Sequence, residues 1–169
     1  MRVPRSERLV IGLAEYVDIP GWRILGLRAK VDTGARSSAL HVENLKEVSR
    51  GRVRFDVRLH RLRSDRRVTV EAKVVRRARV RASTGVASTR IFVAVTIRIG
   101  SVVQEIELGL VDREHMLYRM LLGRMALAGH FLVDPSRRYL ITGARKRPKR
   151  APAARTARPS RPPSQGAAP

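Results

Sequence analysis

Cysteine is absent from the 169 residues of this chain, and its absence excludes several kinds of chemistry. Without thiols there are no disulfide bonds, no thiolate zinc sites and no cysteine nucleophiles, which fits a cytoplasmic protein. No stretch reaches about 18 consecutive apolar residues, so we expect no membrane-spanning segment and no membrane partner. The basic N-terminus has only a short apolar run, broken by Glu15, and does not predict a signal peptide.

The motifs of several ligand sites are also missing. No phosphate-binding GxxxxGK[ST] loop is present, so the sequence does not predict nucleotide binding. The four histidines lie far apart, without an HExxH motif, and a metal site could arise from them only through folding. No GxSxG elbow supports a Ser-His-Asp triad. We therefore expect no cofactor and no bound metal; the histidines are His41, His60, His115 and His130.

Acidic residues are few, and the charge is unevenly distributed. Eight of the 36 basic residues, none of the 14 acidic residues and six of the nine prolines lie in residues 144–169. Such a composition cannot bury enough apolar surface to fold, so it predicts a disordered basic tail after a domain of residues 1–143. A basic tail is typical of an arm that contacts nucleic acid, a ribosome or an acidic partner. A solvated extension in an arginine-rich chain is the alternative.

Apolar and polar residues alternate with a period of two through much of the domain, which predicts strands. Gly100 and Ser101 lie between two of these runs and suit a two-residue hairpin turn. Short strands separated by turns favour a mainly β protein, either a small barrel or a sandwich. The alternating runs are Val53–Leu59, Val68–Val74, Ile91–Ile99 and Ile106–Leu110.

One short helix is predicted near the end of the domain. It begins near Arg124 and ends at Gly129, since glycine commonly follows the last helical residue. Beyond it, Phe131–Val133 and Tyr139–Ile141 are predicted to be strands on either side of a turn. That turn has proline at its second position, where proline is favoured.

The segment around Asp32 is the first candidate for catalysis. The apolar run Ile24–Val31 ends at Asp32, and Thr33 and Gly34 follow immediately. Gly34 permits a sharp turn and lets a substrate approach the carboxylate. Thr33 offers a hydroxyl that can fix a neighbouring loop by hydrogen bonds. The alternative is an ion-paired surface aspartate, because cations flank this segment.

Two motifs together resemble retropepsin-like aspartic proteases. The first is Asp-Thr-Gly-Ala at residues 32–35, and the second is Leu-Leu-Gly-Arg at residues 121–124. In the family, an apolar strand passes behind the active-site loop and leads through Gly-Arg into a short helix. Residues 8–143 resemble the bacterial subgroup of this family often labelled "ATP-dependent zinc protease". The segments that show the resemblance are KVDTGARSSALH, RASTG, MLLGRMAL and GHFLVDPSRRYL.

The resemblance implies a small retropepsin-like (acid protease) β-barrel with one short helix. It places Asp32, Thr33 and Gly34 in the catalytic loop. Because the chain has one DTG motif, the implied enzyme is a homodimer in which the two Asp32 residues meet on the two-fold axis. Two carboxylates so close share one proton, and the pair acts as base and acid. Residues Leu122, Gly123 and Arg124 would support the loop.

Substrate-binding residues follow from the same resemblance. In the family a mobile hairpin closes over the substrate and excludes water, and residues 79–90 suit this flap. An ordinary surface turn is the alternative. The substrate-binding candidates are Ala35, Arg36, Ser83, Thr84 and Gly85.

Arg36 departs from the retroviral pattern, in which the residue after DTGA is commonly acidic and pairs with the arginine of Gly-Arg. Arg124 therefore lacks its usual partner, and two guanidinium groups are expected near the cleft. Cations there would favour an acidic peptide. Members of the subgroup are thought to work beside ligases that add glutamate to proteins, which implies the same class of substrate.

These observations favour an aspartic peptidase acting on a peptide or protein substrate, including acidic or glutamate-modified tails, without zinc dependence. One alternative is a binding module that keeps the retropepsin fold and lacks the chemistry. A second is a basic protein associated with RNA or the ribosome through its charge. The seven aromatic residues do not cluster into a base-stacking platform, so this second alternative depends on electrostatics alone.

Overall fold

The computed structural model describes residues 8–59, 66–81, 85, 87–111 and 117–143. Ser83, Thr84, Asp112 and the predicted tail lie outside the described residues. The described part has one α-helix, α1, and no helix long and apolar enough to span a membrane. The strands are β1 (Leu9–Gly12), β2 (Ala14–Ile19), β3 (Ile24–Val31), β4 (Ser38–His41), β5 (Glu43–Ser49), β6 (Arg52–Arg58), β7 (Arg67–Arg81), β8 (Ala87–Ile99), β9 (Val102–Val111), β10 (Met120–Leu122) and β11 (Phe131–Asp134); the helices are a 3-10 turn at Pro20–Trp22 and α1 at Arg124–Leu127.

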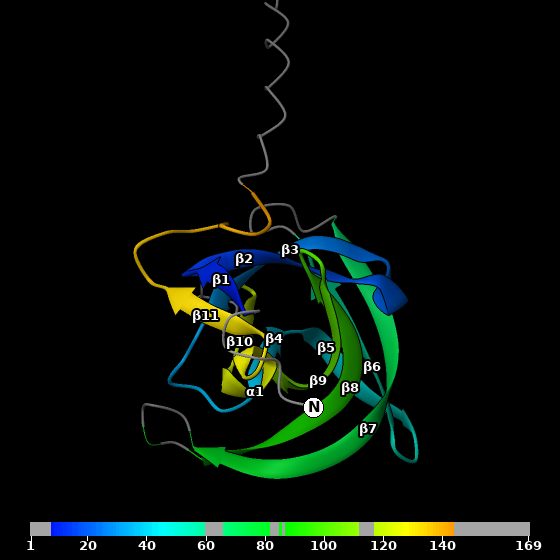
Figure 1. The fold of residues 1–169 in the computed structure, drawn as a ribbon. Helices are drawn as coiled ribbons and strands as arrows, with labels where there is room; N and C mark the ends of the chain where they lie inside the picture. Colours follow the sequence, from blue (N-terminus) through cyan, green and yellow to red (C-terminus); the bar gives the residue numbers. More distant parts are fainter. Residues whose placement is uncertain (1–7, 60–65, 82–84, 86, 112–116, 144–169) are drawn as a thin grey trace, which may run out of the picture.

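Six strands close into a small barrel in the order β2-β3-β10-β4-β9-β8 (Figure 1). The pairing of β2 with β8 closes the ring at Asp18 and Arg98. The Arg98 guanidinium donates to Asp18 Oδ2 at 2.9 and 3.2 Å, so an ion pair reinforces this seam. The mainly β, retropepsin-like barrel with one short helix is therefore confirmed.

The predicted alternation forms the core of the barrel and its extension. On β6, Val53, Phe55 and Val57 are buried, whereas Arg54 between them is exposed and Asp56 is half-buried. The long run on β8 buries every second residue from Val93 to Ile99 in the same way. The predicted hairpin turn is confirmed, since Ile99 pairs with Val102 and Gly100 has φ +58°.

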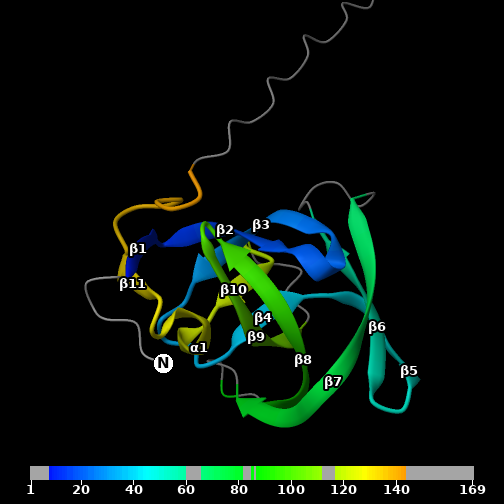
Figure 2. The same ribbon diagram turned by 45° about the vertical axis from the view of Figure 1, so that its right-hand side comes forward.

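A three-stranded extension of the barrel sheet and a separate pair of strands lie beside the barrel (Figure 2). Strands β7, β6 and β5 continue the sheet beyond β8, and β5 lies at its edge with its residues largely exposed. Strands β1 and β11 form a separate parallel pair. Strand β11 confirms the predicted strand at Phe131–Val133, and the predicted helix start at Arg124 is also confirmed. The helix ends at Leu127, two residues before Gly129, because residues 128–130 form a turn.

The predicted strand at Tyr139–Ile141 is wrong, and a buried carboxylate explains why. Glu15 is fully buried in β2, and its carboxylate accepts hydrogen bonds from the backbone amides of Leu140, Ile141 and Thr142. It also accepts bonds from the Gly12 amide and the Thr142 hydroxyl. The amides that a strand would use therefore bind a side chain, and residues 140–142 form turns.

Candidate active site

The predicted catalytic loop is residues 32–37, which join β3 to β4. Strand β10 lies between these two strands, parallel to β3 and antiparallel to β4. Met120 is paired with Ala29 on one side and with Leu40 on the other. The loop must therefore pass over the end of β10, which brings the two sequence motifs together although about ninety residues separate them.

Asp32 is held in place by the backbone around it. Its amide donates to the Leu122 carbonyl at 2.9 Å, which continues the pairing of β3 with β10. Its carboxylate Oδ1 accepts hydrogen bonds from the amides of Gly34 at 3.0 Å and Ala35 at 3.1 Å. Among the described residues, Oδ2 has no hydrogen-bond partner. One oxygen thus fixes the orientation of this half-buried side chain.

Thr33 and Gly34 form the exposed tip of the loop. A Cβ on Gly34 would lie 3.3 Å from Asp32 Oδ1, so even a methyl group would crowd the carboxylate. The Thr33 hydroxyl makes no hydrogen bond within the described part of the chain, and the residue is exposed to solvent.

The second motif, Leu-Leu-Gly-Arg, supports the loop through backbone hydrogen bonds. The carbonyls of Ala35 and Arg36 accept hydrogen bonds from the amides of Arg124 and Met125 at 2.8 and 3.1 Å. These two amides belong to the first turn of α1, whose orphan N–H groups are thereby satisfied. The helix start is therefore fastened to the loop.

Ser38 is a supporting residue that the sequence did not reveal. It is buried at the start of β4, and its hydroxyl accepts a hydrogen bond from the Gly123 amide at 3.1 Å. Ser38 follows Arg36 and Ser37 in a polar stretch of the sequence, so nothing there distinguished it. Its partner Gly123 packs so tightly that a Cβ would lie 2.5 Å from the Ser37 carbonyl.

Gly123→Ala is expected to displace the catalytic loop. The added methyl group would overlap the Ser37 carbonyl, which is backbone and cannot rotate away. Overpacking of this kind costs about 1–3 kcal/mol of unfolding free energy. Thermal denaturation measures that loss. Gly21→Ala is the matched control, since a Cβ there meets nothing within 4 Å; equal stability of the two variants would contradict the tight contact.

The two arginines of the motifs both lie at the surface. Arg36 and Arg124 have exposed side chains, and neither forms an ion pair with a described residue. Arg124 therefore has no acidic partner within the described part of the chain, and both guanidinium groups face solvent.

The predicted flap is a hairpin, although its tip lies largely outside the described residues. Strands β7 and β8 pair up to Arg81 and Ala87. Gly85, at the turn, is exposed and has φ +84°, a conformation that glycine adopts readily. Figures 1 and 2 both show the end of this hairpin on the same side of the barrel as residues 32–37.

Two other titratable groups of the described part, Asp134 and His41, contact neighbouring polar side chains. The hydroxyl and amide of Ser136 donate to the carboxylate of Asp134 and hold its pKa below the usual value. Buried His41 lies 3.4 Å from Glu43. Within the described residues, no group of three or more His, Asp or Glu side chains is placed to hold a metal ion.

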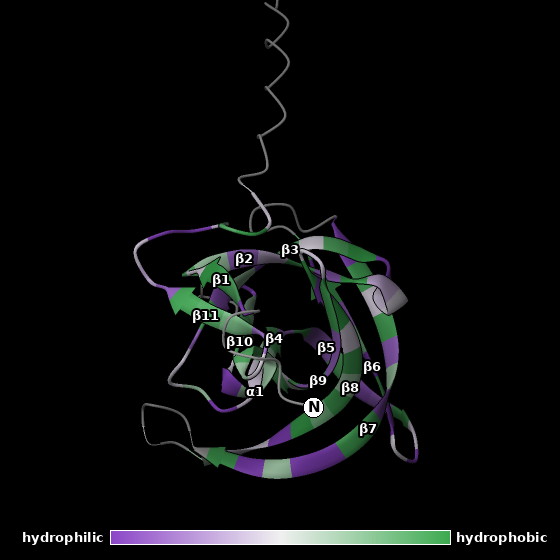
Figure 3. Ribbon diagram, viewed as in Figure 1, coloured by the Kyte–Doolittle hydropathy of each residue, from purple (hydrophilic) through white to green (hydrophobic). Residues whose placement is uncertain are grey.

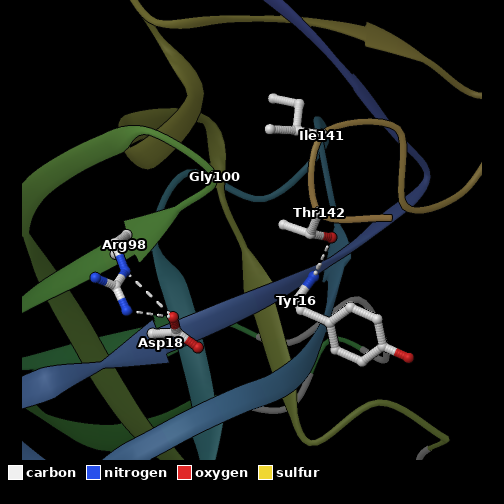
Figure 4. A pocket seen from close by; sticks show the side chains of 6 residues that line it. All are labelled: Tyr16, Asp18, Arg98, Gly100, Ile141 and Thr142. Carbon is white, nitrogen blue, oxygen red and sulfur yellow. Dashed lines mark hydrogen bonds and ion pairs between the residues drawn. The ribbon is translucent and has the colours of Figure 1, made fainter. Parts of the chain in front are cut away.

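A cavity of about 240 Å³ lies at the barrel seam, away from the catalytic loop (Figure 4). The Asp18–Arg98 ion pair forms one wall of the cavity, and Thr142 lies on another wall (Figure 4). Because both charges of this pair neutralise each other, the cavity offers no unpaired charge to a ligand. Its lining residues are Tyr16, Asp18, Arg98, Gly100, Ile141 and Thr142.

The closed barrel, with an Asp-Thr-Gly loop resting on an apolar strand that continues into Gly-Arg and a helix, defines a retropepsin-like protein. The family described as "Retropepsin-like aspartic endopeptidase RimB" matches residues 10–144, and the chain belongs to this RimB-like family.

The chain is also similar to curated relatives and to a solved structure. The chain is 35% identical over 139 residues to a "Probable alpha-L-glutamate ligase" from Shewanella pealeana, covering 80% of this chain and 30% of that protein. A relative of the same name from Parasynechococcus marenigrum is 35% identical over 133 residues, covering 77% of this chain and 28% of that protein. The chain thus spans under a third of these relatives. The crystal structure of Lpg0085 from Legionella pneumophila, a protein of unknown function, has a TM-score of 0.65 and 28% identity, covering 79% of this chain and 98% of that one.

Proposed function

We propose that this protein is an aspartic peptidase whose active site forms when the Asp32 loops of two copies meet. The observation that carries the proposal is the geometry of Asp32, with Oδ1 fixed by two backbone amides and Oδ2 unbonded within the described residues. A carboxylate oriented in this way can accept a proton from water. Because each copy supplies one such carboxylate, the monomer holds half of the site.

In the proposed reaction one Asp32 carboxylate takes a proton from a water molecule, whose oxygen adds to the carbonyl carbon of the substrate. The protonated Asp32 of the second copy donates its proton to the carbonyl oxygen. As the tetrahedral intermediate collapses and the C–N bond breaks, the nitrogen takes the proton that the first carboxylate received from water. One hydroxyl of the intermediate returns a proton to the second carboxylate, which restores the starting state of the pair. Sharing one proton between close carboxylates makes both roles available at once.

The substrate class that we propose is an acidic or glutamate-modified protein tail. The unpaired cations of Arg36 and Arg124 beside the loop would attract carboxylates. The curated relatives are named for ligation of glutamate, which supports a substrate that carries glutamate. We also propose that the protein is cytoplasmic, because a chain without cysteine forms no disulfide bonds and needs no oxidising compartment.

Arg36→Ala is expected to reduce the preference for glutamate-rich over neutral peptides by about tenfold, because a guanidinium–carboxylate contact is strong and directional. The preference is the ratio of kcat/KM for the glutamate-rich peptide to kcat/KM for the neutral peptide. We measure it at high salt, because salt above the physiological concentration screens charges over less than about 8 Å and leaves the close contact. Arg23→Ala is the matched control, an exposed arginine on the connection between β2 and β3. An unchanged ratio in Arg36→Ala would exclude Arg36 as a specificity residue.

A further inference from the structure

A concentration of cations lies on the sheet of β5, β6 and β7, which the proposed peptidase reaction does not use. We define the basic sheet face as Lys46, Arg50, Arg52, Arg54 and Lys73. All five side chains are exposed, whereas Val53, Phe55 and Val57 on the other side of β6 are buried. Figure 3 shows hydrophilic segments on β5 and β7.

Cross-strand register places like charges opposite each other on this face. Arg52 on β6 is paired with Lys73 on β7, and Lys46 on β5 is paired with Arg54 on β6. Like charges directly opposite on neighbouring strands destabilise a sheet. An arrangement with this cost is explained if an anion binds between the cations.

Carboxylates neutralise only part of the face. Arg54 forms an ion pair with Glu71 at 3.2 Å. The other four cations form no ion pair within the described part of the chain. The face therefore keeps an excess of positive charge, spread over three adjacent strands.

The spacing of these cations suits a row of phosphates better than a single small anion. Neighbouring strands lie about 4.8 Å apart, and every second residue along a strand lies about 6.7 Å further on. The basic sheet face therefore presents a grid of positive charges. A polymer with a regularly charged backbone can contact several of them together.

We propose that the basic sheet face binds the phosphate backbone of duplex RNA. Single-stranded nucleic acid is recognised by stacking its bases on aromatic rings, and Phe55, the one aromatic residue on β5, β6 and β7, is buried. Duplex RNA is recognised mainly by shape and backbone contacts, which this surface can supply.

The basic sheet face is separate from the candidate active site. Figures 1 and 2 both show β5 and β6 on the opposite side of the barrel from residues 32–37. RNA binding would therefore leave the Asp32 loop accessible, and a protein substrate held beside the RNA could reach it. Asp32→Asn should accordingly leave RNA affinity unchanged.

The test measures binding of a labelled RNA duplex of about 16 base pairs, a length that a duplex-binding domain spans, to the full chain by fluorescence anisotropy. The test variant replaces Arg50, Arg52 and Lys73 by Gln. The matched control replaces Arg23, Arg137 and Arg138, three exposed arginines outside the face, by Gln. Both remove three positive charges, so any effect of net charge or of residues 144–169 is the same in both.

We expect the test variant to bind the duplex about tenfold more weakly in low salt, with a salt slope reduced by about two to three, while the control changes less than about threefold. Its thermal midpoint should not fall, because a cross-strand repulsion is removed; if it does fall, the single Arg52→Gln variant serves instead. Equal weakening in test and control variants would overturn the proposal. So would tighter binding of the same duplex as DNA, or displacement of the RNA by polyglutamate of equal charge.

Discussion

Asp32→Asn is expected to abolish hydrolysis, lowering kcat by about a thousandfold or more, because the amide cannot accept a proton from water. Asparagine has the same size and keeps an oxygen that can accept the bonds of the Gly34 and Ala35 amides. The fold should therefore be retained, with an unchanged thermal midpoint. Turnover of a glutamate-rich peptide by the two purified proteins measures the effect.

Asp134→Asn is the matched control for this substitution. Asp134 lies on β11, and its carboxylate accepts hydrogen bonds from the amide and hydroxyl of Ser136. Replacing this carboxylate should therefore affect the turn that follows β11 rather than hydrolysis. Equal turnover by wild type and Asp32→Asn would contradict the aspartic mechanism. Residual activity that a chelator abolishes would instead indicate a zinc-dependent reaction.

Specific activity is expected to fall steeply on dilution, because a monomer with one Asp32 holds half a site and the dimer population follows mass action. Well below the dissociation constant, activity per mole should be proportional to total concentration, so tenfold dilution costs about tenfold in specific activity. Sedimentation measures the dimer population over the same range, and the two curves should share a midpoint.

A monomer with full activity would contradict the shared site. It would require a second acid from the same chain, and Asp112 and Asp134 are the first candidates to replace. Of these, Asp134 already accepts hydrogen bonds from Ser136, while Asp112 lies outside the described residues.

The strands that could be predicted are those whose residues alternate between core and solvent. Val53, Phe55 and Val57 on β6 show this pattern and are buried as expected. Strand β5 lacks it, because an edge strand that faces solvent on both sides has no apolar face to mark it. Apolar and polar residues alternate only in a strand that buries one of its two faces, so the sequence does not predict a strand that is exposed on both.

The C-terminal turn could not be predicted, because its cause lies far away in sequence. Tyr139–Ile141 has the composition of a strand, yet Glu15 binds the amides that follow Tyr139. A buried carboxylate with several backbone donors is a tertiary contact across more than 120 residues. Local propensity yields to such contacts.

The candidate site was recognisable because its two motifs are short and ordered, whereas its supporting contacts were not. Asp32 and Gly123 could be named from their neighbours in sequence. The bond from the Gly123 amide to Ser38 depends on β4 lying beside β10, which only the sheet order reveals. Motifs thus indicate the reacting groups, and topology supplies their positions.

Mixing wild type with Asp32→Asn tests the shared site most directly. The two proteins are combined in equal amounts, well above the dimer dissociation constant, and allowed to exchange subunits. If both carboxylates are required, only dimers of two wild-type copies hydrolyse the peptide, and activity should be about one quarter of that of the same total amount of wild type. An activity of about one half would show that each copy works alone, and it would contradict the account.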